Sequence, residues 1–232
     1  MTKSKKPGTD GSGNSKNPRL HQKVKTAKRR SISSNRWLQR QINDPYVKKA
    51  KALGYRSRAA FKILDLDDKF KFFKPQQVVI DLGAAPGGWC QVAAERCKGG
   101  TIIALDLLPI EPLAGVHCLE MDFMAEDAPE KLRALMPEGG AHMVISDMAP
   151  NASGDPSLDH LRIMGLVEAA LEFAYEVLRP GGGFVCKVWQ GGTEAELLKQ
   201  LRLRFATVRH AKPESSRKGS AETFLVATGF KG

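Results

Sequence analysis

Four aspartates lie at the ends of predicted strands, beside one glycine-rich turn. Asp81 and Asp106 end two successive apolar segments, 25 residues apart, and Asp122 and Asp147 follow two more. A single aspartate in such a place is more often a cap or turn residue, but four in register with one turn are hard to explain in that way. Beyond the carboxyl ends of strands in an open α/β sheet, a carboxylate can accept both hydroxyls of a ribose. We expect this role of Asp106, and we expect Asp122 to accept from an exocyclic amine.

The turn at residues 83–88 contains three glycines, which let a ligand approach the backbone closely. Its spacing, Gly-x-x-x-Gly-Gly, is not the dinucleotide-binding fingerprint, and no lysine follows as a phosphate-binding loop requires. A cationic sulfonium also explains the acidic lining better than a pyrophosphate does. The pattern therefore favours S-adenosylmethionine as the ligand.

The segment 146–151, at the fourth strand end, bears on the atom that receives a methyl group. Methylases of exocyclic amines place a Pro-Pro-aromatic motif here, but no aromatic residue follows Pro150. Pyrimidine C5 methylases need a cysteine nucleophile, usually after proline, and none of the four cysteines has that context. The remaining polar candidates suit a hydroxyl acceptor.

Lys187 is a charge inside the otherwise apolar segment 183–189. Such a lysine is costly unless it is paired or functional, and strand alternation puts it on the face opposite Cys186. With a depressed pKa it could remove the proton of a hydroxyl, and if charged it could orient the hydroxyl and stabilise the oxyanion. Both roles stay open. Taken singly, Lys62 and Glu222 are typical of surface charges.

Strands and helices alternate from residue 77 onward, and these elements must position the candidate residues. Near-continuous apolar strands separated by helices predict a mainly parallel sheet with helices on both faces. Two late strands without a long helix between them allow the last one to run antiparallel. We expect an α/β, Rossmann-like methyltransferase fold with a seven-stranded sheet, its strands at 77–82, 101–106, 115–120, 142–147, 183–189, 206–210 and 223–228, and its main helices at 56–70, 89–97, 158–178 and 193–203.

The net charge of +11 is concentrated in the N-terminal third of the chain. Residues 1–74 contain 21 of the 36 Lys and Arg but 5 of the 25 acidic residues, a local charge of +16. This distribution favours a polyanionic partner such as nucleic acid, although a merely solubilising arm stays open. A membrane partner is disfavoured, because residues 1–36 show no apolar helical stripe and no apolar run is long enough to span a bilayer.

Two regions are predicted along the chain. Residues 1–34 bury too little apolar surface to fold and are predicted to be a basic disordered tail, and residues 35–232 are predicted to be the catalytic domain. The N-terminus lacks the apolar core of a secretory signal. The four cysteines have no zinc-ligand spacing and are typical of free thiols in a cytoplasmic protein: Cys90, Cys97, Cys118 and Cys186.

Motifs in four places resemble the FtsJ/RrmJ family, also called RlmE. They lie at residues 56–62, 81–89 and 146–151, and at 215–217 together with Glu222. The resemblance covers the chain from about Ser34 to the C-terminus. It implies bacterial enzymes that methylate the 2′-hydroxyl of a uridine ribose in 23S ribosomal RNA of the large subunit. More selective for this branch are residues 36–39, residues 106–109 and the Gly-Gly before Trp89.

The resemblance also implies the site residues. The family's Lys-Asp-Lys-Glu tetrad matches Lys62, Asp147, Lys187 and Glu222. No metal is expected, and the product of the methyl donor is S-adenosyl-L-homocysteine. The residues implied to contact S-adenosyl-L-methionine are Gly87, Trp89, Asp106, Asp122 and Asp147.

The partner implied is ribosomal RNA, which we expect to bind the basic N-terminal third of a monomeric enzyme. Arg56 and Arg58 lie in the predicted helix 56–70 beside Lys62, and the tail 1–36 carries 11 Lys and Arg against one Asp. Two alternatives stay open, a transfer RNA 2′-O-methyltransferase and a catalytically silent ribosome assembly factor. A small-molecule methyltransferase is disfavoured, because it would not need so basic a first third.

Overall fold

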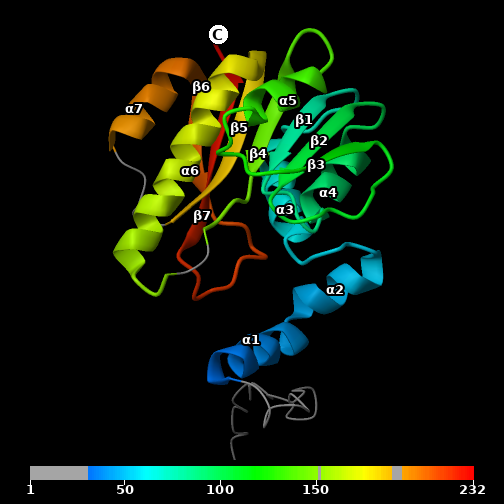
Figure 1. Cartoon of the computed structure of the whole chain (residues 1–232), viewed down its shortest axis with the longest axis vertical. Helices are drawn as coiled ribbons and strands as arrows, with labels where there is room; N and C mark the ends of the chain where they lie inside the picture. Colours follow the sequence, from blue (N-terminus) through cyan, green and yellow to red (C-terminus); the bar gives the residue numbers. More distant parts are fainter. Residues whose placement is uncertain (1–30, 151–152, 190–194) are drawn as a thin grey trace, which may run out of the picture. The chain divides into compact units, whose positions relative to one another are not determined.

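A seven-stranded sheet lies at the centre of the computed structural model, which describes residues 31–150, 153–189 and 195–232. Its strands are β1 (Val78–Leu82), β2 (Thr101–Asp106), β3 (Val116–Glu120), β4 (Ala141–Ser146), β5 (Leu178–Trp189), β6 (Phe205–Ala211) and β7 (Glu222–Phe230). Their order is β3-β2-β1-β4-β5-β7-β6 (Figure 1). The pairs from β3 to β5 are parallel, whereas β7 runs antiparallel to β5 and β6. The predicted sheet is confirmed.

Helices cover both faces of this sheet, because successive strand residues point to opposite sides. Val79 of β1 belongs to a buried cluster with α3 (Ala60–Phe70) and α4 (Gly88–Arg96), and the adjacent Ile80 belongs to a second cluster with α5 (Ala128–Ala134), α6 (Pro156–Val177) and α7 (Ala195–Arg204). Helices on both faces were predicted and are confirmed. The helices are α1 (Ile32–Asn43), α2 (Pro45–Leu53), α3 (Ala60–Phe70), α4 (Gly88–Arg96), α5 (Ala128–Ala134), α6 (Pro156–Val177) and α7 (Ala195–Arg204).

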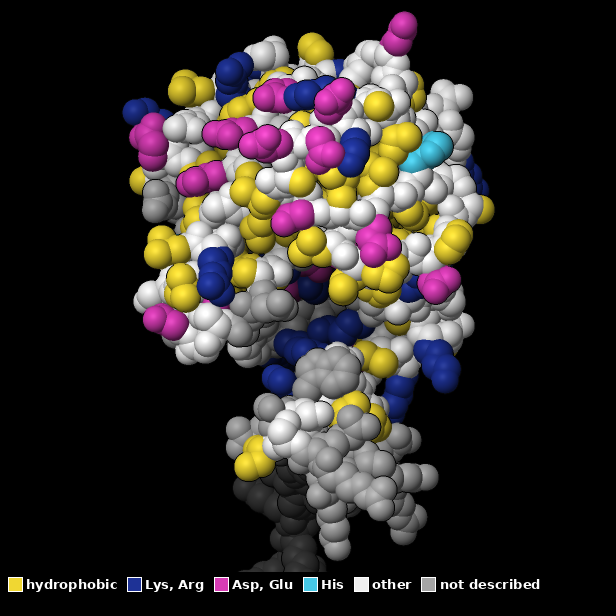
Figure 2. Space-filling model, in the orientation of Figure 1, with side chains coloured by type: hydrophobic (Ala, Val, Ile, Leu, Met, Phe, Trp, Pro, Cys, Tyr) yellow, Lys and Arg dark blue, Asp and Glu magenta, His cyan; other side chains and the backbone are white. Residues whose placement is uncertain are grey.

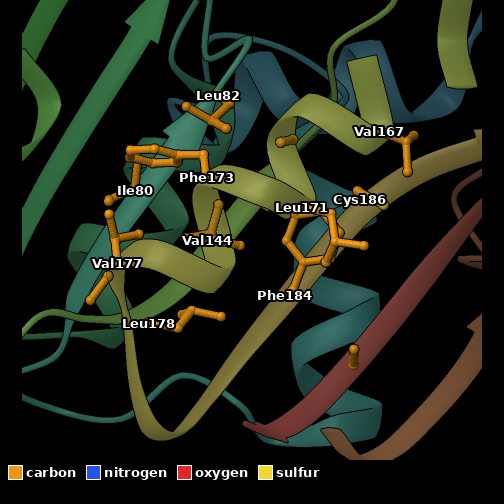
Figure 3. Close-up of a cluster of buried hydrophobic side chains, with 14 of the residues drawn as sticks. Ile80, Leu82, Val144, Val167, Leu171, Phe173, Val177, Leu178, Phe184 and Cys186 are labelled. Atoms are coloured by element: carbon orange, nitrogen blue, oxygen red, sulfur yellow. The ribbon is translucent and has the colours of Figure 1, made fainter. Parts of the chain in front are cut away.

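Helix α6 supplies much of the larger cluster. Its Val167 and Leu171 belong to this cluster, with Leu171 beside Phe184 of β5, and Phe173 reaches Ile80 of β1 (Figure 3). The helix begins after Asp155, whose carboxylate accepts from the backbone N–H groups of the first turn.

The strand order reverses at β1, which lies between β2 and β4. Ligands in open α/β sheets bind outside the carboxyl ends of the strands at such a switch point. Leu82 pairs with Ser146, so the glycine-rich turn and the segment with Asp147 leave the sheet next to each other. They lie so close that a Cβ on Gly83 would come within 2.6 Å of Met148 Cγ.

The helix predicted over residues 56–70 begins only at Ala60. The backbone N–H of Arg56 donates to Gln91 Oε1, and Lys62 N donates to Ala59 O in a tight three-residue turn. Residues 56–59 therefore form the approach to the helix, and Arg58 is not on it. Lys62 is on α3, as predicted.

Two further elements differ from the prediction. Helix α5 was not predicted, and its two buried side chains, Ala128 and Leu132, give too weak a periodicity to detect. Strand β5 begins at Leu178, directly after α6, instead of at residue 183. The strand therefore includes Pro180-Gly181-Gly182. The irregular register between Ala141 and Met143 of β4 accommodates the longer strand.

The chain divides into two units between Val47 and Lys48. The first contains α1, whose N-cap Ser31 accepts from the backbone N–H of Ser34. Helix α1 thus begins inside the last residues of the predicted tail. Residues 1–30 lie outside the described residues, so the disordered tail stays a prediction.

Candidate active site

Two lysines and two carboxylates from four separate segments meet at the carboxyl end of the parallel strands. Lys62 comes from α3, Asp147 from the loop after β4, Lys187 from β5 and Glu222 from the start of β7. Lys62 Nζ lies 2.7 Å from Glu222 Oε2 and 3.2 Å from Asp147 Oδ2. Lys187 Nζ lies 3.1 Å from Asp147 Oδ1. The four side chains form one continuous ion-pair network.

The network is shielded from solvent, since its four side chains are only 10–17% exposed. Burial acts to raise the pKa of Asp147, but the ammonium groups of Lys187 and Lys62 outweigh burial and hold that pKa below its ordinary value. Burial acts to lower the pKa of Lys62, but Asp147 and Glu222 outweigh it and raise that pKa. Asp147 and Lys62 are therefore fixed charges of opposite sign.

Lys187 is oriented by the backbone as well as by a carboxylate. Its Nζ donates to the carbonyl oxygen of Asp147 at 2.6 Å, in addition to the ion pair with the same residue. The neighbouring Cys186 and Val188 point into the larger core cluster on the other face of the sheet. The prediction that Lys187 and Cys186 face opposite ways is confirmed, and the ammonium group points to the strand-end loop.

Glu222 is held by a second set of contacts. Its Oε1 accepts from Ser216 Oγ at 3.0 Å, and its backbone N–H donates to Ser220 Oγ at 3.2 Å. Its other oxygen is thereby left for Lys62. The register of the β5–β7 pair aligns Lys187 with Phe224 and Trp189 with Glu222, so Glu222 lies two residues beyond Lys187 at the same end of the sheet.

One supporting residue was not recognised in the sequence. Asp65 Oδ2 accepts from the backbone N–H of Ser215 at 2.8 Å, and Arg58 donates to the Ser215 carbonyl oxygen. The loop that carries Ser216 is thus tied to α3 by Asp65 and to the residues just before α3 by Arg58. The only sequence signal for Asp65 is its spacing of three residues from Lys62, which places both on one side of the helix.

Asp81 lies beneath the glycine-rich turn and is fully buried. Its Oδ2 accepts from Cys90 Sγ at 3.0 Å, and its Oδ1 has no hydrogen-bond partner among the described residues. Burial raises the pKa of Asp81 to about 7, against the lowering effect of the Cys90 hydrogen bond. The charges of Asp147 and Asp106 add to the rise. The site thus has a buried carboxyl with an unused acceptor.

Asp106 and Asp122 shape the loops that follow their strands. The two carboxylate oxygens of Asp106 accept from the backbone N–H groups of Ala85 and Leu108, at 2.9 and 2.8 Å. The exposed Asp122 accepts from the backbone N–H of Met124 at 2.9 Å. Each oxygen keeps further lone pairs, so both carboxylates can still accept from a ligand.

Trp89 has a structural role that the sequence did not reveal. Its side chain is 3% exposed, its indole Nε1 donates to the Ala59 carbonyl oxygen at 2.9 Å, and its ring packs 5.6 Å from that of Phe224. The indole therefore joins α4 to the start of α3. What Trp89 can still offer a ligand is its backbone N–H in the first turn of α4.

Arg56 fastens the loop after β2 beside the glycine-rich turn. Its guanidinium donates to the carbonyl oxygens of Pro86, Glu111 and Pro112, at 3.2, 2.7 and 2.9 Å. Gly87, at φ 105°, leaves the space that this requires, because a Cβ there would lie 2.8 Å from Arg56 Nη1. Arg56 and Arg58 were predicted as RNA contacts, and in the structure the guanidinium groups of both donate to backbone carbonyls.

Charge is unevenly distributed over the described surface. In Figure 2, acidic side chains are prominent over the upper part of the 48–232 unit, and Lys and Arg side chains gather lower down.

Within the described residues, no group of three or more His, Cys, Asp or Glu is arranged to hold a metal ion. No described helix has the length and hydropathy needed to cross a bilayer. The four cysteines are free, and Cys118 alone among them is exposed.

Known proteins share this arrangement of sequence and fold. Residues 55–230 match the family model described as FtsJ-like methyltransferase. A ribosomal RNA large subunit methyltransferase E of Paramagnetospirillum magneticum is 58% identical, over 97% of this chain and 93% of that protein. The protein of the same name in Caulobacter vibrioides is also 58% identical, over 90% of this chain and 92% of that protein.

A solved structure is similar as well. It is a crystal structure described as a ribosomal RNA methyltransferase from Plasmodium falciparum, with a TM-score of 0.69 and 29% sequence identity. The match covers 77% of this chain and 100% of that one. The likeness therefore extends from the sequence to the arrangement of the sheet and its helices.

Proposed function

Since the chain belongs to the FtsJ-like methyltransferase family, we propose that it is the ribosomal RNA methyltransferase that modifies a uridine ribose 2′-hydroxyl in 23S RNA of the large subunit. The observation that carries this proposal is the ion-pair network of Lys62, Asp147, Lys187 and Glu222 at the strand ends. It offers a hydroxyl a nearby amine, fixed charges of both signs and no cysteine nucleophile.

The methyl donor that fits the neighbouring site is S-adenosylmethionine. The unused Oδ1 of buried Asp81 and the close turn at Gly87 support this fit. The sulfonium, when bound, supplies an electrophilic methyl group. The residues that would hold the donor are Gly87, the backbone of Trp89, Asp106, Asp122 and Asp147.

Lys187 is the residue that we assign to the proton of the 2′-hydroxyl. Lys62 contacts two carboxylates and stays charged, whereas Lys187 contacts one carboxylate, which it shares with Lys62. Lys187 is therefore the less strongly paired of the two amines, and we assign the contact with the hydroxyl to it. Lys62 and Glu222 would position the ribose, and Asp147 would hold both amines in place.

Ribose-methylation mapping tests the proposal directly. Purified protein and S-adenosylmethionine would be incubated with unmodified large subunits, with naked 23S RNA and with transfer RNA. We expect one uridine of the 23S RNA to be methylated by the wild type and not by a Lys187→Met variant. Methylation of transfer RNA alone would support the transfer RNA alternative, and no methylation of any RNA would support the silent assembly factor.

RNA contacts outside the catalytic network belong to the same proposal. The basic N-terminal third would bind the phosphate backbone, and the tail 1–36 would add contacts that do not depend on base sequence. Arg56 and Arg58 would assist by fixing the loops on which RNA rests. We place this enzyme in the cytoplasm, where ribosomal subunits are assembled.

Donor affinity should depend on pH through Asp81. With a pKa raised to about 7, Asp81 is mainly protonated below neutral pH and ionised above it. A cationic donor favours the ionised form, so its dissociation constant should fall several-fold between pH 5.5 and 7.5, by at most roughly tenfold per pH unit. Calorimetric titration at several pH values measures this.

The Asp81→Asn variant is the matched control, because it removes the titrating group and keeps its size. Its affinity should be weaker at pH 7.5 and should follow only the titration of the donor itself. Equal pH profiles for the two proteins would show that Asp81 does not ionise in contact with the donor.

A further inference from the structure

A cavity of about 310 Å³ lies at the end of the sheet opposite the catalytic network. Its lining comes from residues 70–77 before β1, from the first residues of β4, from the start of β5 and from Thr228 of β7. Met143, Gly183 and Thr228 are register partners across three adjacent strands. Lys187 and Glu222 lie on the same two strands, β5 and β7, but at the opposite end of the sheet. The cavity is thus separate from the catalytic network.

The charge of this cavity is positive. Lys71, Lys74, Arg179 and His142 contribute to its lining, and no Asp or Glu does. Asp68 contacts Lys71 at 3.6 Å between two exposed side chains but is not part of the lining. Within the described part of the chain, no carboxylate forms an ion pair with Arg179. Three cationic side chains and one imidazole thus surround a space large enough for an anion.

The contacts of His142 show that an acceptor is missing there. The backbone N–H of Val78 donates to Nδ1 at 3.0 Å, so the proton of the neutral ring is on Nε2. Nε2 lies 3.0 Å from Nη1 of Arg179, which is always a donor. Two N–H groups therefore face each other. Protonating the ring does not help, because Nδ1–H would then face the N–H of Val78.

An oxyanion within reach of both N–H groups would satisfy them together. A phosphate oxygen can accept from the imidazole Nε2–H and from the Arg179 guanidinium at once. Lys71 and Lys74 would add charge at the rim, where both are exposed. Lys71 and Lys74 belong to the basic residues 1–74, whereas Arg179 and His142 belong to residues 75–232, which contain 20 acidic against 15 basic residues.

We propose that this cavity binds a phosphate of the RNA backbone, at a point on the substrate remote from the reacting ribose. The inference rests on the proposed function, which makes RNA the polyanion at hand. An RNA that is held at both ends of the strands is fixed in orientation as well as in position. Phosphate contacts of this kind carry no base specificity.

Salt dependence of RNA binding tests the site. Dissociation constants for a 23S RNA fragment would be measured over a salt series for the wild type and for an Arg179→Ala/Lys74→Ala variant. Each lost phosphate contact should lower the log–log slope by roughly 0.7–0.9. For the one phosphate proposed, we therefore expect the slope to fall by roughly 0.7–0.9 and low-salt affinity to weaken about tenfold. Donor affinity and turnover at saturating RNA should not change.

The Lys199→Ala/Arg202→Ala double variant is the matched control, because it also removes two positive charges, in this case from α7 and away from the cavity. If it lowers the slope as much as the cavity variant does, the effect is one of overall charge and the site is overturned. Unchanged slopes in the cavity variant overturn it as well.

The remaining outcomes separate this inference from the proposed function. If the cavity variant has the smaller salt-dependence slope but the wild type methylates no RNA, the phosphate site stands and the proposed function fails. If methylation is normal and the slopes are equal, the proposed function stands and the phosphate site fails. A melting temperature equal to that of the wild type would show that the variant is folded.

Discussion

Replacing Lys187 by methionine should lower the rate of methyl transfer by roughly 10²–10⁴-fold, the usual contribution of a positioned general base. Donor affinity and melting temperature should change little, because Asp147 keeps Lys62 as its counter-charge at 3.2 Å. Methionine has a similar length and no amine. Single-turnover rates with saturating RNA and donor measure the chemical step apart from binding.

Lys187→Arg distinguishes the two roles that a lysine can have here. Arginine keeps the positive charge and can still pair with Asp147, but it cannot give up its proton near neutral pH. If Lys187 is the base, the arginine variant should be as slow as the methionine variant. If Lys187 only orients the hydroxyl, the arginine variant should retain much of the rate. A near wild-type rate in Lys187→Met would exclude both roles.

The fold could be predicted because its strands are buried on both faces. All five residues of β1 are buried, and four of the six in β2, so these strands are nearly continuous apolar runs. Element boundaries that depend on one or two residues could not be predicted. The start of α3 depends on a backbone bond from Arg56 to Gln91, 35 residues away, and no local pattern reports such a contact.

The candidate site was predictable in part. Lys187 could be singled out because it is a charge between apolar neighbours. Lys62 and Glu222 could not be chosen on their own, because 160 residues separate them and only the fold brings them to 2.7 Å; the family resemblance linked them. The pairing of His142 with Arg179 had no sequence signal, since it depends on how β4 and the start of β5 meet.

Asp147→Asn should be the most damaging substitution in the network for stability. It leaves Lys187 without a carboxylate partner and Lys62 with one instead of two. Removing one partner of a buried pair typically costs about 3–5 kcal/mol, and we expect the lower end, because Glu222 still neutralises Lys62. Turnover should also be lost, since Asp147 positions both amines. Denaturant unfolding at neutral pH measures the free energy of unfolding.

A double-mutant cycle with Lys187→Met shows whether the loss comes from the unpaired charge. The double variant should have a higher free energy of unfolding than Asp147→Asn alone, because it removes the buried ammonium, yet it should remain inactive.

The pH dependence of the free energy of unfolding gives a second check. The pKa of Asp147 is lowered on folding, so its stabilising effect is present above its unfolded pKa, ~3.9, and is lost as pH falls through the folded pKa. Wild type and Asp147→Asn should therefore differ at neutral pH and converge in acid. Additive losses in the cycle would mean that Asp147 and Lys187 are not energetically coupled, and that the ion pair does not hold Lys187 in place.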